Sequence, residues 1–274
     1  MSSHFYRFSD NTTIAYKDFN SHKSDSLVFI HGNSNSSRVW TPQIDSKTLS
    51  DYRIITPDLP GHGQSSAIAS GDYSVINMAS IMVKFVNAVV GKVSYCLVGL
   101  SLGGNVIAEM LRLGCQPTGI ALISTGLVGK EVPVARVVRD GVVAEVLFQP
   151  SPALSSIQRY YSTLIRQNNS SLVDMLIEDH CKTRPQFRAE FPKSIGEGKY
   201  SDELDLVRKW GKQPLVVYGC DDQSIPPDVL DQVELPYWGG GIHKFTDVGH
   251  LVNIDQPLLF DELIRQYCQD VFSI

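Results

Sequence analysis

The sequence lacks the long apolar segments that would place a protein in a membrane. No stretch approaches the roughly 18 consecutive apolar residues that a spanning helix requires. Residues 1–20 contain no basic segment followed by an apolar run, so the sequence predicts no secretory signal. Internal repeats and low-complexity tracts are also absent. We therefore expect a globular protein without a membrane partner, located in the cytoplasm.

Paired cysteines and metal-binding clusters are missing as well. The five cysteines are an odd number and are widely scattered along the chain. None forms a CxxC pair or a cysteine–histidine cluster with the spacing of a zinc site. The sequence therefore predicts neither a disulfide framework nor a bound metal, and nothing in it indicates a cofactor.

The chain has no excess of positive charge. Its 24 lysines and arginines are outnumbered by 29 aspartates and glutamates, and the charges form no blocks of like sign. A mildly acidic surface has no electrostatic attraction for phosphate backbones. Nucleic acid is therefore not an expected partner, while the oligomeric state, monomer or homodimer, is left open.

What the 274 residues do contain is an alternation of strand and helix patterns. Hydrophobic residues make up 43% of the chain, which is ample for a large buried core. The expected strands are residues 14–19 (one arm of an N-terminal hairpin), 27–30, 53–55, 95–98, 120–123 and 215–218. The expected helices are residues 75–89, a helix that follows Ser101 and ends at Gly114, and a last helix capped by Asp255. This alternation predicts an α/β fold, with a mostly parallel central sheet flanked by helices.

One long segment, residues 127–207, interrupts the alternation because no strong strand pattern occurs in it. Three helical patterns fill the segment, at residues 132–148, 152–167 and 171–181. An all-helical insertion between two strands of a sheet is typical of a lid over an active site. The sequence thus predicts a core made of residues 1–126 and 208–274, with residues 127–207 as a helical cap.

The sharpest local motif is Gly99-Leu100-Ser101-Leu102-Gly103, which lies between an expected strand and an expected helix. The five-residue pattern alone occurs by chance in roughly one chain in ten of this length, so its context matters. A tight strand-to-helix turn exposes a serine hydroxyl and requires small residues two positions before and after it. The helix that follows also favours negative charge developing at its N-terminus. Ser101 is therefore the predicted nucleophile.

A second motif, His31-Gly32-Asn33-Ser34, comes directly after a buried strand. Acyl transfer needs two N–H donors aimed at the oxygen that becomes negatively charged in the tetrahedral intermediate. We expect the backbone amides of Asn33 and Leu102 to form this oxyanion hole. His31 is interpreted as a residue that orients the loop rather than as a base.

The expected acid and base come late in the chain. Asp221 and Asp222 follow the strand at residues 215–218, and His250 lies beyond the last strand, before the final helix. Neighbouring side chains diverge, so only one of the two aspartates is expected to face the histidine, and we choose Asp222. The order Ser101, Asp222, His250, with each residue after a strand, predicts a catalytic triad.

These motifs resemble those of the α/β-hydrolase superfamily. HGN, DLPGHGQS, GLSLGG, GCDDQSIP and DVGHLVNIDQP occur in the family's order and span essentially the whole chain. The family's spacing of glycine, aspartate and proline matches Gly219, Asp222 and Pro226, which favours Asp222 over Asp221. The resemblance also implies a helical cap near residues 127–207.

Within the superfamily, HGNSNSS followed by TPQI, together with DLPGHG, is similar to the serine-dependent N-acyl-homoserine lactonases. That resemblance implies substrate contacts by Gly32 and Asn33. It also implies a cap tyrosine that donates to the substrate, with Tyr160 the best match and Tyr161 beside it. HGN occurs in haloalkane dehalogenases too, but those enzymes need a carboxylate nucleophile where this chain has Ser101. The HxHxDH cluster of metal-dependent lactonases is absent.

The sequence therefore predicts a cofactor-independent serine hydrolase that cleaves a carboxylic ester or lactone of a small, partly apolar substrate through an acyl-enzyme. Phe148, Tyr160, Tyr161 and Leu164 of the predicted cap favour an apolar acyl group. Two alternatives stay open, because a fold and a triad do not define a reaction. The same triad could serve a C–C bond hydrolase or perhydrolase, and the scaffold could serve as a ligand receptor with little turnover.

Overall fold

The computed structural model describes residues 3–137, 141–167 and 169–273. These residues form an eight-stranded sheet in the order β1-β2-β4-β3-β5-β6-β7-β8. The strands are β1 (His4–Arg7), β2 (Thr13–Phe19), β3 (Ser26–Ile30), β4 (Arg53–Pro57), β5 (Tyr95–Leu100), β6 (Gly119–Ile123), β7 (Leu215–Gly219) and β8 (His243–Phe245). β2 pairs antiparallel with β1 and β4, and every other pairing is parallel. The predicted mostly parallel α/β sheet is confirmed.

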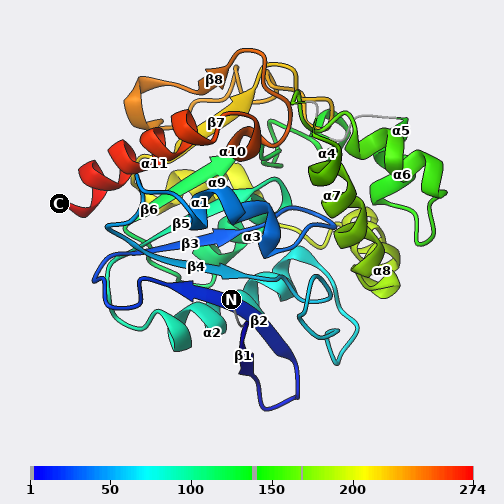
Figure 1. Ribbon diagram of the computed structural model, residues 1–274, viewed down its shortest axis with the longest axis horizontal. Helices are drawn as coiled ribbons and strands as arrows, with labels where there is room; N and C mark the ends of the chain where they lie inside the picture. Colours follow the sequence, from blue (N-terminus) through cyan, green and yellow to red (C-terminus); the bar gives the residue numbers. More distant parts are fainter. Residues whose placement is uncertain (1–2, 138–140, 168, 274) are drawn as a thin grey trace.

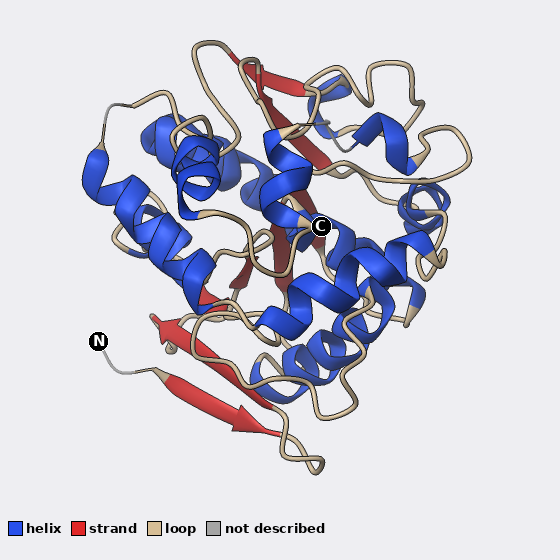
Figure 2. Ribbon diagram, turned by 90° about the vertical axis from the view of Figure 1, so that its right-hand side faces the viewer, coloured by secondary structure: helices blue, strands red, loops and turns tan. Residues whose placement is uncertain are grey.

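Helices cover both faces of the sheet, as Figure 2 shows. The long helices that do so are α2 (Val75–Val89), α3 (Leu102–Arg112), α9 (Glu203–Trp210) and α11 (Pro257–Phe272). Successive residues of a strand point to opposite faces. Val28 and Ile30 of β3 pack in the core beneath α2, α3 and α9, whereas Leu27 and Phe29 pack beneath α11. Because the central strands are buried on both faces, their sequences are continuous apolar runs.

Four shorter helices join these elements. They are η1 (Ser37–Trp40), α1 (Thr41–Ile44), η2 (Trp238–Gly240) and α10 (Val252–Asp255). Within the described ranges, no helix combines the length and the apolar character that crossing a membrane would need.

The chain between β6 and β7 contains helices and loops but no strand among its described residues, as the sequence indicated. Its helices are α4 (Val134–Val137), α5 (Val142–Leu147), α6 (Leu154–Tyr161), α7 (Ser170–Lys182), α8 (Pro185–Gly196) and α9. Figure 1 shows α4 to α8 gathered at one side of the molecule. By contrast, α9 lies against α3 of the sheet layer. The proposed division into a core and a cap of residues 127–207 stays a prediction.

The start of the last helix differs from the sequence prediction. Gln256, not Asp255, is the residue at the N-cap position of α11. The Asp255 carboxylate instead accepts hydrogen bonds from the backbone N–H groups of Gly249, at 2.8 Å, and Arg166, at 2.9 Å. The predicted capping role was therefore wrong, because two backbone donors outside α11 compete successfully for this carboxylate. These bonds tie the segment after α6 to the loop that carries His250.

Candidate active site

Ser101 occupies a strained turn between β5 and α3. Its backbone φ is 51° and its ψ is -120°, a conformation that non-glycine residues rarely adopt. The Ser101 N–H donates to the Ile123 carbonyl at 2.8 Å, and its carbonyl accepts from Gly104 N–H at 2.8 Å. The turn is thus held by the neighbouring strand and by the first turn of the helix, and it places the serine at the end of the strand.

The glycines after Ser101 allow this turn to pack closely. A Cβ atom at Gly103 would lie 2.2 Å from the Ile30 carbonyl oxygen, and one at Gly104 would lie 2.1 Å from Thr125 Oγ1. Neither approach is compatible with a side chain at the glycine. The small residues that the motif requires are therefore enforced by β3 and by the segment after β6.

Asp222 and His250 are joined by a buried hydrogen bond. His250 Nδ1 lies 2.7 Å from Asp222 Oδ2, and the two residues are 4% and 1% exposed, respectively. The second carboxylate oxygen, Oδ1, accepts from the backbone N–H groups of Ser224, at 2.7 Å, and Ile225, at 3.0 Å. A carboxylate held in this way keeps the proton on Nδ1 and leaves Nε2 as a proton acceptor.

The neighbouring aspartate has a different environment. Asp221 forms an ion pair with Arg166, with 3.3 Å between its Oδ2 and the arginine Nε, and its side chain is 38% exposed. The divergence of adjacent side chains that the sequence suggested is therefore present. Of the two aspartates, only Asp222 hydrogen-bonds His250 among the described residues.

Ser101 is the third member of the predicted triad. It lines a pocket together with Ser224, whose backbone holds the Asp222 carboxylate. In the described part of the chain, no hydrogen bond joins Ser101 Oγ to His250. Such nucleophile–base bonds are often longer before substrate binds and shorten in the reacting complex. The structure thus brings the predicted acid and base into contact and places the predicted nucleophile on the pocket wall.

The expected oxyanion donors lie on either side of Ser101. Leu102 is the first residue of α3, where a backbone N–H has no partner within the helix. Asn33 and Leu102 both line the pocket. A Cβ atom at Gly32 would lie 3.3 Å from the Ser101 Cβ, so the Gly32–Asn33 loop passes directly beside the serine.

His31 holds this loop, as interpreted from the sequence. Its Nδ1 lies 2.8 Å from the Gly32 carbonyl oxygen, and its Nε2 accepts from the Leu59 N–H at 2.9 Å. The ring is fully buried, and burial lowers the pKa of His31. Both ring nitrogens are engaged by backbone groups, so His31 has no free nitrogen for catalysis.

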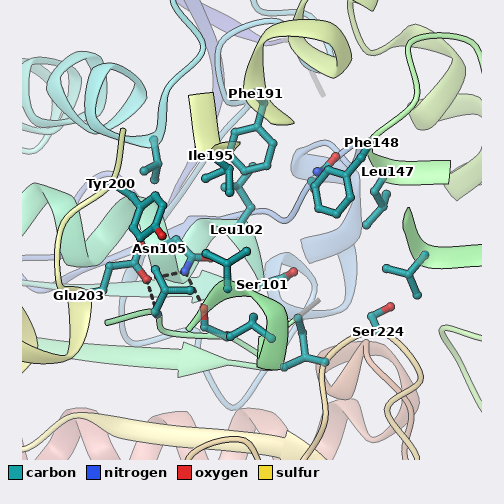
Figure 3. Close-up of a pocket in the computed structure, with 18 of the residues that line it drawn as sticks. Ser101, Leu102, Asn105, Leu147, Phe148, Phe191, Ile195, Tyr200, Glu203 and Ser224 are labelled. Atoms are coloured by element: carbon teal, nitrogen blue, oxygen red, sulfur yellow. Dashed lines mark hydrogen bonds between the residues drawn. The ribbon is translucent and has the colours of Figure 1, made fainter. Parts of the chain in front are cut away.

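The pocket is largely apolar, with polar groups at its ends (Figure 3). Helices α4, α5, α6 and α8, with one residue just after α5, contribute Val134, Val137, Val143, Leu147, Phe148, Tyr160, Phe191 and Ile195. Apolar side chains make up most of its wall, and a few polar groups interrupt them, which is the lining typical of small-molecule sites. A small and partly apolar ligand therefore fits it.

The two candidate cap tyrosines have separate surroundings. The hydroxyl of Tyr160 lies 3.1 Å from Ser224 Oγ, and Tyr160 lines the pocket. Burial raises the pKa of this phenol, which therefore keeps its proton. The hydroxyl of Tyr161 lies 3.2 Å from His180 Nδ1, and neither Tyr161 nor Leu164 is among the residues that line the pocket.

Comparison with known proteins gives the family of the chain. A family model described as the alpha/beta hydrolase family matches residues 27–263. The chain belongs to this family. A cluster of three or more histidine, cysteine, aspartate or glutamate side chains able to hold a metal ion does not occur within its described ranges.

Relatives of this alpha/beta hydrolase carry several activities. It is 26% identical to the dihydrolipoyllysine-residue acetyltransferase component of an acetoin cleaving system from Cupriavidus necator, over 89% of this chain and 63% of that protein. It thus spans less than two thirds of that relative. It is 23% identical to the 2-hydroxy-6-oxononadienedioate/2-hydroxy-6-oxononatrienedioate hydrolase of Escherichia coli K12, over 89% of this chain and 86% of that protein. A crystal structure of a mutant of the N-acyl homoserine lactonase AidH, complexed with N-hexanoyl homoserine lactone, superposes with a TM-score of 0.90, at 23% identity and with both chains fully covered.

Two polar residues of this hydrolase's pocket were not foreseen from the sequence, Asn105 and Glu203. Asn105 Nδ2 donates to the Gly126 carbonyl at 2.9 Å and to Glu203 Oε2 at 2.7 Å. Asn105 lies four residues after Ser101 on a helix, and that spacing could have indicated it. Glu203 is the first residue of α9, and acidic side chains are common at the start of a helix. Its position in the sequence therefore did not indicate that it would line a pocket.

The Glu203 carboxyl makes the stability of this hydrolase depend on pH. Burial raises the pKa of Glu203 from 4.5 to about 8, although hydrogen bonds from Val128 and Asn105 favour the charged form. The folded state therefore holds a proton that the unfolded state releases between pH 4.5 and 8, so the free energy of unfolding falls as the pH rises through this range. A Glu203→Gln variant has no proton to lose there. We expect its stability relative to the wild type to rise by roughly 2–3 kcal/mol between pH 6 and pH 8.

Urea unfolding of both proteins at the two pH values measures this difference. Any other group that titrates cancels in the comparison, because both proteins carry it. A difference in unfolding free energy that is the same at pH 6 and pH 8 would show that Glu203 is already ionised in the folded state.

Proposed function

We propose that the protein is a cofactor-independent serine hydrolase that cleaves a carboxylic ester or lactone through an acyl-enzyme. The observation that carries the proposal is the buried Asp222–His250 hydrogen bond, beside a pocket that Ser101 lines from a strained turn. Buried carboxylate–imidazole pairs of this kind supply the base that a serine hydroxyl needs.

In the first half of the reaction, Ser101 Oγ attacks the substrate carbonyl carbon while its proton passes to His250 Nε2. The carbonyl oxygen becomes negatively charged and accepts hydrogen bonds from the N–H groups of Asn33 and Leu102. Collapse of this intermediate breaks the carbon–oxygen bond of the leaving group, which takes the proton from His250. The alkoxide thus becomes an alcohol, which departs from an ester substrate and remains attached to the acyl group of an opened lactone, and the acyl group stays bonded to Ser101.

In the second half, water enters the site and attacks the acyl-enzyme. His250 removes a proton from the water, whose oxygen attacks the ester carbonyl of the acyl-enzyme. The second intermediate collapses, the proton returns to Ser101 Oγ, and the carboxylic acid leaves. Asp222 holds the imidazole in one orientation and stabilises its positive charge in both halves.

Among possible substrates, we favour a lactone or ester with an apolar acyl group, such as an N-acyl-homoserine lactone. The likeness in fold to AidH supports this choice, as does the position of Tyr160 on the pocket wall beside Ser224. Tyr160 would donate its hydroxyl proton to the substrate, while Gly32 and Asn33 would contact the lactone carbonyl. Phe148 and its apolar neighbours would enclose the acyl chain.

A second candidate function is hydrolysis of a C–C bond. The Escherichia coli relative is named for the hydrolysis of a 2-hydroxy-6-oxo dienoic or trienoic diacid, and the same three residues could serve that chemistry here. The lining that the structure describes is largely apolar and includes no basic side chain, which disfavours this function, because charged carboxylates would lose their hydration there.

A substrate panel distinguishes these functions. It includes nitrophenyl esters of graded acyl length, acyl-homoserine lactones and a 2-hydroxy-6-oxo dienoate, together with labelling by a fluorophosphonate probe. We expect turnover of esters or lactones and covalent labelling of Ser101. Turnover of the dienoate alone would favour the C–C hydrolase. No labelling and no turnover, with tight reversible binding of a lactone, would indicate a receptor.

A further inference from the structure

We propose that Asn105 and Glu203 form a polar subsite at one end of the apolar pocket, which selects acyl groups that carry a neutral hydrogen-bonding substituent such as a hydroxyl. The inference rests on the proposed function, because Ser101 must act on the carbonyl of the same acyl group. None of the motifs that predict the triad includes either residue.

The position of the subsite follows from α3. Asn105 comes four residues after Ser101, which corresponds to roughly 6 Å along the helix axis. Figure 3 shows Asn105, Glu203 and Tyr200 together on one side of the pocket, with Ser224 on the opposite side of Ser101. A substituent several bonds away from the scissile carbonyl would therefore reach Asn105 and Glu203.

The hydrogen bonds of Glu203 leave one of its oxygens free. Oε2 accepts from Asn105 Nδ2 at 2.7 Å and from the Val128 N–H at 3.0 Å. Oε1 has no hydrogen-bond partner among the described residues, although the Glu203 side chain is only 1% exposed and lines the pocket. An oxygen on the pocket wall that no described protein group satisfies can bond a ligand, so a ligand that supplies the partner gains affinity.

The protonation state of Glu203 indicates which ligand group fits. Burial raises the pKa of Glu203 to about 8, so near neutral pH the carboxyl is uncharged and can donate a hydrogen bond from Oε1. Asn105 Oδ1 is available as an acceptor, because the bonds of Asn105 to Gly126 and Glu203 use its Nδ2 group. A hydroxyl can accept from the carboxyl and donate to the amide oxygen at the same time.

Charged groups around Glu203 could instead favour a cationic ligand. The carboxylates of Glu109 on α3 and Asp202 before α9 raise the pKa of Glu203 further by repulsion. Glu109 is itself paired with Arg112, with 2.8 Å between Oε2 and Nε, which offsets part of its charge. We therefore favour the neutral ligand, and an ammonium group serves as the opposing case in the test.

The test compares three nitrophenyl esters of equal chain length: hexanoate, 6-hydroxyhexanoate and 6-aminohexanoate. In the wild type at pH 7, we expect kcat/KM for the hydroxy ester to equal or exceed that for hexanoate. A pocket without a polar partner would process the hydroxy ester about tenfold less efficiently or worse, since the hydroxyl would lose its hydration. That result, or a preference for the amino ester, would overturn the proposal.

Variants at position 203 locate the effect. Glu203→Met should lower the ratio of kcat/KM for the hydroxy ester to kcat/KM for hexanoate about tenfold. Glu203→Gln keeps a donor and an acceptor, so this ratio should stay within about threefold of the wild-type value. Ile195→Val, on the apolar wall, should change kcat/KM for both esters by the same factor and leave their ratio unchanged. An unchanged ratio in folded Glu203→Met would also overturn the proposal.

Unreactive amides separate the subsite from catalysis. The wild type should bind 6-hydroxyhexanamide at least as tightly as hexanamide, and Glu203→Met should lose that preference. If this pattern holds but no ester is hydrolysed, the proposed function fails while the subsite stands. If esters are hydrolysed but neither amide is preferred, the subsite proposal is wrong while the proposed function stands.

Discussion

Replacing Ser101 by alanine is expected to lower kcat for ester hydrolysis by about 10⁵-fold, while the protein stays folded. The hydroxyl supplies the atom that becomes bonded to the acyl group, and nothing else in the described pocket replaces it. Ser101 Oγ takes part in none of the hydrogen bonds that hold the turn, which run through its backbone N–H and carbonyl, so its removal leaves the turn intact. Ester hydrolysis and fluorophosphonate labelling measure the loss.

The matched control is Ser162→Ala, which removes an exposed serine hydroxyl bonded to the Gln158 carbonyl on α6. It should hydrolyse esters and take up the label as the wild type does. Undiminished turnover by Ser101→Ala, with normal thermal stability, would rule out the acyl-enzyme mechanism and leave Ser101 as a structural residue.

Changing Asp222 to asparagine should lower kcat by about 10⁴-fold. The asparagine amide can donate to His250 Nδ1, which moves the imidazole proton to Nε2. In that tautomer, Nε2 can no longer accept the serine proton. The asparagine oxygen can still accept from the N–H groups of Ser224 and Ile225, so the loop after β7 should keep its shape.

Asp221→Asn is the natural comparison for this variant. Asp221 is partly exposed and pairs with Arg166, and its loss removes a surface ion pair worth little to stability. We expect its kcat to remain within about twofold of the wild type. The reverse pattern, with Asp221→Asn inactive and Asp222→Asn active, would transfer the role to the other aspartate. The kcat values at one pH, with thermal denaturation of each variant, decide between the two outcomes.

The strands and the turn at Ser101 could be predicted because they depend on local chemistry. A strand buried on both faces must be apolar along its whole length, so β3 and β5 are visible as runs of such residues. The crowding at Gly103 and Gly104 is likewise visible in the sequence, because only glycine fits at these two positions.

Asp255 shows where local rules fail. An aspartate before a proline at a helix start has the features of an N-cap. Its carboxylate instead binds the backbone of Gly249 and Arg166, and Arg166 is far away in the sequence. Residue type describes what a side chain can bind, whereas only the folded chain determines which donors come within reach.

The amino-acid sequence by itself predicted the alternation of the central strands with helices, the tight turn at Ser101 and the candidate roles of Ser101, Asp222 and His250, because these leave local patterns and motifs. The sequence could only rank Asp222 over Asp221 and Tyr160 over Tyr161, and it gave no sign that Glu203 lies next to Asn105. The tertiary structure decided that Asp222 contacts His250 while Asp221 pairs with Arg166, and that Tyr160 lines the pocket while Tyr161 does not. The physical reason is that these features depend on interactions between residues far apart in the sequence. Burial, hydrogen-bond direction and the raised pKa of Glu203 all arise from groups that the chain brings together only by folding.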